Sequence, residues 1–203
     1  MPQANAPPSE GIFGDPVITT AAFRGEVRTE WQTQVDDDDR KMVLLEDFEF
    51  LADDSADGRW IAARGQSVDG ASIPSVLWSF VGSPFVGNYR RASVIHDVYC
   101  SHNGLPPVER ARRTSAAVHR VFFLAMLKDR TSLRQACLMY AAVALFGPTW
   151  DPNGNRRVAQ EGIMSPTDVE KYRGAVNDFL NGPVPLTLPA LATKLAESLG
   201  FPE

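Results

Sequence analysis

The spacing of the apolar residues changes once along this chain, and that change limits the folds open to it. Between Asp15 and Val68, β-branched and aromatic residues mix with polar ones in PVITTAAFRGEVRTEW and alternate in MVLLEDFEFLA, which is typical of strands with one buried face. After Pro74 the pattern becomes helical. We therefore expect an α+β protein, in which a small N-terminal antiparallel sheet is followed by a helical bundle.

Breaks in the second half predict where the helices lie. A first helix is expected from Arg90 to Ser101 and a second from Val108 to Lys128, separated by Gly104-Leu105-Pro106-Pro107. These two would form an antiparallel helix hairpin. A third helix is expected to be capped by Thr131 and to stop at Gly147-Pro148.

Two further helices are expected after a predicted core domain of residues 15–148. Ser165-Pro166-Thr167-Asp168 has the residues of a capped helix start, and that helix should run to about Leu180. The last helix places Leu191, Leu195 and Leu199 on one face. We divide the chain into a flexible arm (1–14), the core domain (15–148) and a C-terminal helical extension (149–203).

Composition excludes some classes of protein. The formal net charge of −5 gives no basic surface for a phosphate backbone, so nucleic acid is not expected as a partner. The run CLMYAAVALF is shorter than the ~20 residues that span a bilayer, which favours a buried helix over a transmembrane segment. The start, MPQANAPPSEG, lacks the pattern of a secretory signal, so export would need host lysis or a secretion machine. Two cysteines, Cys100 and Cys137, are too few for a disulfide scaffold, and the sequence leaves their pairing open.

All three histidines, at positions 96, 102 and 119, lie close together in the sequence. In VIHDVYC, His96 shares a helix face with Tyr99 and Cys100, whereas Asp97 lies about 100° further round. His119 belongs to an apolar stripe, where a histidine is more often a hydrogen-bonded core residue than a ligand. Across a helix hairpin, however, His96 and His119 would approach each other. A buried histidine pair needs a shared proton, a bridging water or a metal.

A second polar group, VDGASIP, follows the last expected strand. Its local chemistry favours a strand-to-helix junction in which Asp69 and Ser72 bond to backbone N–H groups. No Gly-x-Ser-x-Gly pattern occurs, so the sequence gives little support for a serine nucleophile at Ser72. Four consecutive carboxylates, Asp36 to Asp39, lack the spacing of a calcium loop and indicate a solvated turn.

These motifs, in this order, resemble a bacterial and phage family known as domain-of-unknown-function family 1353. The resemblance runs from about Met42 to Gly147 and rests on LLEDFEF, VDGASIP, LWSFVGSPFVGNYRRA, VIHDVYC, VHRVFFLAM and MYAAVALFG. It implies a phage, prophage or bacterial origin, often in a virion or lysis context, but no activity. The family pattern has an aspartate at the position of His119.

The same region is loosely similar to bacterial secreted phospholipases A2. The likeness lies in Asp69-Gly70-Ala71-Ser72, the loop GSPFVG and His96-Asp97-Val98-Tyr99. It implies that His96 is a general base, oriented by His119 in place of a carboxylate. It also implies that Asp97 holds a calcium ion that stabilises an oxyanion.

Two functions from different classes fit this sequence. One is a metal-assisted, calcium-type hydrolase acting on a lipid ester or another cell-envelope bond, with His96, Asp97 and His119 at its centre and Asp69 nearby. The other is a non-catalytic component of a phage virion, tail or secreted effector assembly. Its N-terminal arm and C-terminal helix would then dock on partner subunits. Zinc held by His96, His119 and a carboxylate is a third interpretation, less favoured than calcium.

Overall fold

The fold is taken from a computed structural model of the 203-residue chain. The arm 1–14, the carboxylates 36–39 and the positions of Ser72 and His102 lie outside the residues that it describes. The described residues are 20–32, 41–52, 58–69, 87–100, 105, 107–157, 165–182 and 187–200.

The first half of the described chain forms two three-stranded antiparallel sheets. Their strand orders are β1-β4-β5 and β2-β3-β6. Alternation explains their inner faces: Met42 and Leu44 are buried around a half-buried Val43, and Phe48 and Phe50 are fully buried around Glu49. The strands are β1 Ala22–Arg24, β2 Thr29–Trp31, β3 Met42–Leu44, β4 Phe48–Leu51, β5 Arg59–Ala62 and β6 Ser67–Val68.

The second half is mainly helical, which confirms the predicted α+β class. Helices α2 and α4 pack side by side as the expected hairpin, and α4 packs in turn on α5. The helices are α2 Arg90–Cys100, α3 Pro107–Arg112, α4 Ser115–Lys128, α5 Leu133–Phe146, α6 Pro166–Leu180 and α7 Leu188–Leu199. None of the helices in these ranges is long and apolar enough to cross a membrane.

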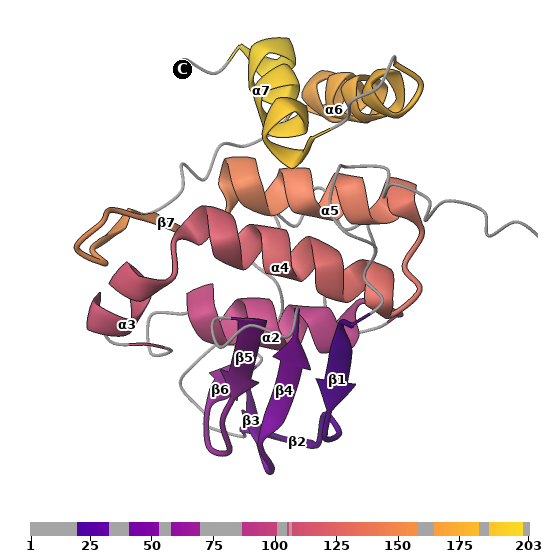
Figure 1. Ribbon diagram of the computed structural model, residues 1–203. Helices are drawn as coiled ribbons and strands as arrows, with labels where there is room; N and C mark the ends of the chain where they lie inside the picture. The colour runs from indigo at the N-terminus through magenta and orange to yellow at the C-terminus, as the bar shows by residue number, and fades with distance from the viewer. Residues whose placement is uncertain are drawn as a thin grey trace, which may run out of the picture.

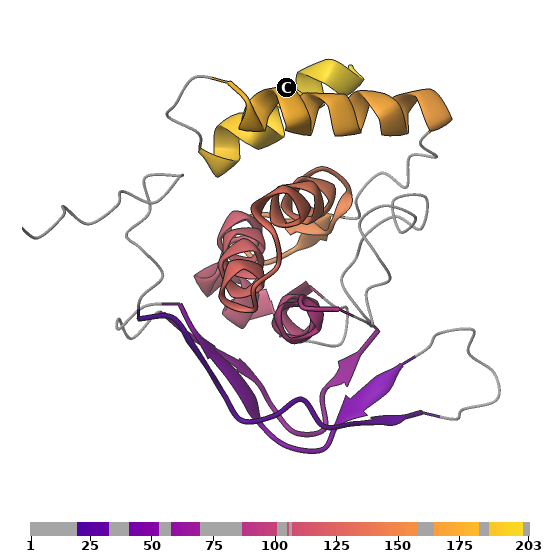
Figure 2. The same cartoon turned by 90° about the vertical axis from the view of Figure 1, so that its right-hand side faces the viewer.

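The elements form layers, as Figures 1 and 2 show. The two sheets curve around α2, which lies against β5 and β6. Helices α4 and α5 form the next layer, and α6 and α7 cover α5 on the far side. Tyr172 of α6 and Leu191 and Leu195 of α7 are fully buried in that outer interface. Helix α2 is therefore enclosed on both sides, by sheet and by helix.

Three expectations about element boundaries were wrong. The second helix is interrupted after Arg112, because the Thr114 side chain accepts a hydrogen bond from the Ala117 N–H and starts α4 there. Ser132, rather than Thr131, caps α5. A short hairpin follows α5 where only helix was expected, formed by β7 Thr149–Trp150 and β8 Arg156–Arg157.

Other boundaries were predicted correctly. Ser165 and Asp168 form a complete capping box at the start of α6, which ends at Leu180. Helix α7 buries Leu191 and Leu195 on the expected face. The proposed division at residue 148 remains a prediction.

Candidate metal centre

The chemistry of this fold centres on α2, which carries polar side chains into the interior. His96 and Asp97 are 0% and 1% exposed, although both belong to residue types that usually stay near water. They are buried because α2 lies between the sheets and α4. Each buried polar group needs a specific partner, since burial without one destabilises the folded state.

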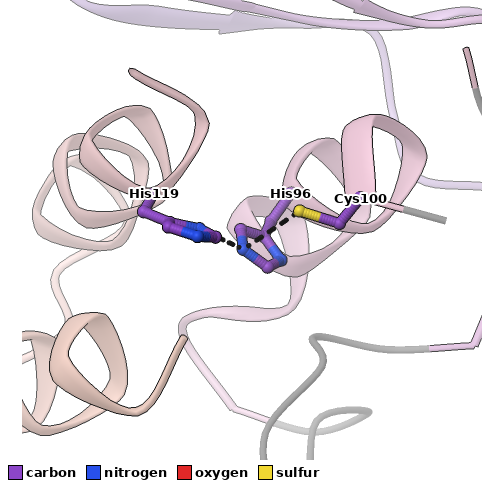
Figure 3. Close-up of side chains that lie close together, drawn as sticks. All are labelled: His96, Cys100 and His119. Carbon is purple, nitrogen blue, oxygen red and sulfur yellow. Dashed lines mark hydrogen bonds between the residues drawn. The ribbon is translucent and has the colours of Figure 1, made fainter. Parts of the chain in front are cut away.

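His96 meets His119 across the helix hairpin, as Figure 3 shows. The Nε2 atom of His96 lies 3.0 Å from the Nδ1 atom of His119. His119 is 3% exposed, so both rings are inside the protein. The expected approach of these two histidines is confirmed.

Cys100 lies beside the two histidines, a contact that the sequence analysis did not predict. Its Sγ atom lies 3.5 Å from His96 Nε2, because the two residues are one helical turn apart on the same face of α2. One potential ligand atom from each of His96, Cys100 and His119 lies within 4.8 Å of the other two. The detectable sequence signal was His-x-x-x-Cys, the i, i+4 spacing of ligands on one helix.

Hydrogen bonding alone leaves this cluster poorly satisfied. A neutral imidazole nitrogen carries either one lone pair or one N–H, so His96 Nε2 serves one of its two contacts well but not both. In the described part of the chain, His96 Nδ1 is buried without a hydrogen-bond partner. Two imidazole nitrogens and one cysteine sulfur that converge on one point match the donor types of a metal site.

Burial keeps both histidines in the form that binds metals. It lowers the pKa of His96 well below its usual value, and the neighbouring His119 lowers it further. It lowers the pKa of His119 to about 4, although the nearby Pro148 carbonyl acts in the opposite direction. Because metals bind neutral imidazole, both rings are ready to act as ligands at neutral pH.

Asp97 points away from this cluster, as its helical position predicted. Its Oδ2 atom accepts a hydrogen bond of 2.6 Å from the backbone N–H of Asp69, at the end of β6. The side chain of Asp69 is exposed. Neither carboxylate is part of the convergent cluster, and the described residues give no support for calcium at Asp97.

Tyr99 ties α2 to the sheet on the other side. Its hydroxyl accepts a hydrogen bond of 3.0 Å from the Ile61 N–H in β5. Its ring packs edge-on against Trp60, and the Arg113 guanidinium lies over both rings. Tyr99 therefore fixes α2 relative to β5.

The burial of His96 bears on its predicted role. A general base must reach water and substrate, but His96 is 0% exposed in this fold. A metal ligand has no such requirement, because only the open position of the ion must be reached. The structure therefore suits His96 as a ligand better than as a base.

Comparison with known proteins places these residues in a family. Residues 42–143, about half of the chain, match the family model described as "Protein of unknown function (DUF1353)". Both arms of the hairpin, and thus all three residues of the cluster, lie within that range.

Two curated relatives come from Sinorhizobium fredii (strain NBRC 101917 / NGR234). The uncharacterised protein y4jT is 41% identical over 138 residues, which are 68% of this chain and 39% of the relative. The uncharacterised protein y4iH is 43% identical over 91 residues, which are 45% of this chain and 35% of the relative. The matches thus span less than half the length of these relatives. No solved structure matches the chain.

Proposed function

Since the chain belongs to the family of proteins of unknown function DUF1353, we propose a function from its site: a zinc-type metal hydrolase. In this proposal His96, Cys100 and His119 hold the ion. The observation that carries it is the convergence of their three donor atoms in the protein interior. The proposed substrate remains a lipid ester or another cell-envelope bond.

The distances support a tetrahedral ion. Zinc binds histidine nitrogen at about 2.0 to 2.1 Å and cysteine sulfur at about 2.3 Å, which separates two nitrogen ligands by about 3.3 Å and nitrogen from sulfur by about 3.6 Å. The corresponding distances here are 3.0 Å and 3.5 Å. These two pairs therefore need to open by only a few tenths of an ångström, and the third pair, Cys100 and His119, has its ligand atoms within 4.8 Å of each other.

The donor types favour zinc over calcium, which revises the metal expected from the sequence. Calcium takes six to eight oxygen ligands, whereas zinc takes imidazole nitrogen and thiolate sulfur. Among the described residues the cluster offers two nitrogens and one sulfur. Asp97, the expected ligand, is engaged with the Asp69 backbone instead.

Among the described residues three protein ligands converge, a number that supports hydrolysis rather than a purely structural ion. Structural zinc sites usually have four protein ligands, but catalytic sites have three and leave the fourth position for water. An ion held there would lower the pKa of a bound water to about 7 and would polarise a carbonyl oxygen. His96 then serves as a ligand, and Asp97 and Tyr99 hold the ligand helix against the strands.

A non-catalytic role in an assembly is the second candidate, and one observation favours it. His96, Asp97 and Tyr99 are all buried, and Asp97 and Tyr99 bond directly to backbone groups of the strands. Such residues cross-link the strand junction to the helix hairpin without any chemistry. A phage or prophage setting, and partner subunits at the N-terminal arm or last helix, remain predictions.

The test is a hydrolysis assay with defined metal content. Wild-type protein would be stripped with EDTA, reloaded with zinc or calcium, and incubated with phospholipid vesicles and with peptidoglycan. The variant Cys100→Ala removes one ligand. Cys137→Ala is the matched control, because Cys137 is also a fully buried cysteine but lies outside the cluster, on α5.

We expect hydrolysis of one substrate by zinc-loaded wild-type protein and by Cys137→Ala, but not by Cys100→Ala. EDTA should abolish it, and zinc rather than calcium should restore it. Folded, zinc-loaded wild-type protein that cleaves neither substrate would contradict the hydrolase and leave the assembly role.

A further inference from the structure

A second buried polar group lies outside the metal cluster: the guanidinium of Arg110. This residue of α3 is only 9% exposed. Its Nε and Nη1 atoms are buried and have no hydrogen-bond partner within the described ranges. Together they leave three N–H groups without an acceptor.

Charged residues beside Arg110 on α3, and Asp151 beside Trp150, have partners of their own. Glu109, its neighbour on α3, pairs with Arg112 at 3.6 Å. The Asp151 carboxylate accepts hydrogen bonds from the backbone N–H groups of Asn153 and Asn155 within its own turn. Arg113 donates to the Arg59 carbonyl at 2.7 Å.

The hairpin after α5 holds α3 in place. The Trp150 indole N–H is shared between the carbonyls of Arg110 and Arg113, at 3.0 and 2.8 Å. At the turn of the hairpin, a side chain on Gly154 would meet the Pro107 carbonyl at 2.0 Å, so backbone lies against backbone there. The backbone of α3 is therefore fixed while the Arg110 side chain keeps free donors.

A guanidinium group in a protein carries a permanent positive charge. Burying it without an acceptor is strongly unfavourable unless an anion accompanies it. Planar guanidinium groups bind carboxylate and phosphate oxygens well. We propose that Arg110 binds an oxyanion, a phosphate or carboxylate group carried by the ligand of this domain.

The position of Arg110 links it to the metal cluster. Pro148, whose carbonyl lies near the His119 ring, directly precedes β7, and Trp150 of β7 bonds to the Arg110 carbonyl. On the α2 side, Tyr99 precedes Cys100 and lies beneath Arg113. The Arg110 site and the cluster thus share one end of the helix hairpin. The assignment of the anion to a substrate rests on the proposed hydrolase function. On that basis, the substrate of the hydrolase carries an anionic group.

Inorganic phosphate and acetate are the probes. Binding to full-length protein would be measured by titration calorimetry and by thermal unfolding, in EDTA, so that neither anion can bind a metal. Arg110→Met removes the charge and keeps the length of the side chain. Arg112→Gln is the matched control, because Arg112 lies on the same helix with a side chain that is 73% exposed.

We expect saturable phosphate or acetate binding by wild-type protein and Arg112→Gln, and affinity at least tenfold weaker in Arg110→Met. At ten times the dissociation constant, the anion should raise the Tm of wild-type protein by about 3 to 6 °C. Tighter binding of phosphate than of acetate would assign a phosphoryl group, and the reverse a carboxylate.

Absence of saturable binding of either anion by folded wild-type protein would overturn the proposal, as would equal weakening in Arg110→Met and Arg112→Gln. Should Arg110→Met fail to fold, Arg110→Lys decides, because it keeps the charge but loses the planar donors. Tenfold weaker binding supports the site and unchanged affinity contradicts it. The anion-binding assay needs no metal, so a negative result does not bear on the zinc proposal. A negative result in the hydrolysis assay likewise does not bear on anion binding at Arg110.

Discussion

Acid should destabilise the metal-free protein well before its carboxyl groups titrate. Burial lowers the pKa of His119 to about 4 and that of His96 well below the ordinary value. In the unfolded chain both return to about 6.5. Between pH 6.5 and pH 4 the unfolded state therefore binds protons that the folded state does not bind. The free energy of unfolding falls as the pH falls through this range.

The size of the effect follows from the pKa difference. A pKa of about 4 when folded and about 6.5 when unfolded removes about 2 kcal/mol of stability between pH 7 and pH 5 for His119 alone. The pKa of His96 shifts in the same direction, so His96 adds to this loss. A loss of about 2 kcal/mol from His119 alone is already a substantial part of the 5 to 15 kcal/mol typical of a folded domain.

The assay is urea denaturation in EDTA at pH 7 and pH 5, followed by the fluorescence of the buried Trp60 and Trp150. His119→Leu removes one of the two groups and should reduce the loss of stability by about 2 kcal/mol. A loss below 1 kcal/mol in wild-type protein, or an unchanged loss in His119→Leu, would refute the assignment of this acid sensitivity to the buried pair.

Two substitutions around the site and one control in α6 test its packing, again by urea denaturation at pH 7. Tyr99→Phe removes the acceptor of the Ile61 N–H and should destabilise by about 1 to 3 kcal/mol, whereas a loss under 0.5 kcal/mol would show that the bond is dispensable. Gly154→Ala should destabilise by more than about 1 kcal/mol, because Gly154 has φ +79° and the new Cβ would lie 2.0 Å from the Pro107 carbonyl. Gly174→Ala, in the interior of α6 with nothing within 4 Å of the added Cβ, should instead stabilise by up to about 1 kcal/mol. Equal effects at the two glycines would contradict the close packing at the hairpin turn.

The sequence predicted those features of the fold that depend on residues close together in the chain. The capping residues Ser165 and Asp168 and the apolar face of the last helix reflect neighbours a few positions apart, so the pattern alone identified them. The approach of His96 and His119 followed from assuming that two consecutive helices pack antiparallel.

What the sequence did not predict depends on competition between local signals or on distant contacts. Thr114 lies inside the stretch that the sequence predicts as one helix, and only its cap to Ala117 shows that it starts a new helix. The hairpin after α5 was not predicted, although Asp151 to Gly154 is a strong turn signal. Its strands are only two residues long and lie between two segments with helical patterns.

In the candidate site, too, local patterns could be predicted from the sequence and contacts between distant residues could not. Cys100 was placed on the same face as His96, but its role became visible only with His119 beside it. Arg110 gave no signal, because α3 was expected to be part of one longer helix and its burial depends on β7.

The central claim is that His96, Cys100 and His119 form one metal site, and metal stoichiometry tests it most directly. Purified protein would be stripped, titrated with zinc and with cobalt, and analysed for bound metal beside Cys100→Ala and Cys137→Ala. We predict one zinc per chain in wild-type protein and Cys137→Ala, with a thiolate-to-cobalt absorption band in the cobalt form. Cys100→Ala should lose the band and bind zinc at least tenfold more weakly. Folded wild-type protein that binds no zinc, or a Cys100→Ala variant that binds it as tightly, would contradict the account.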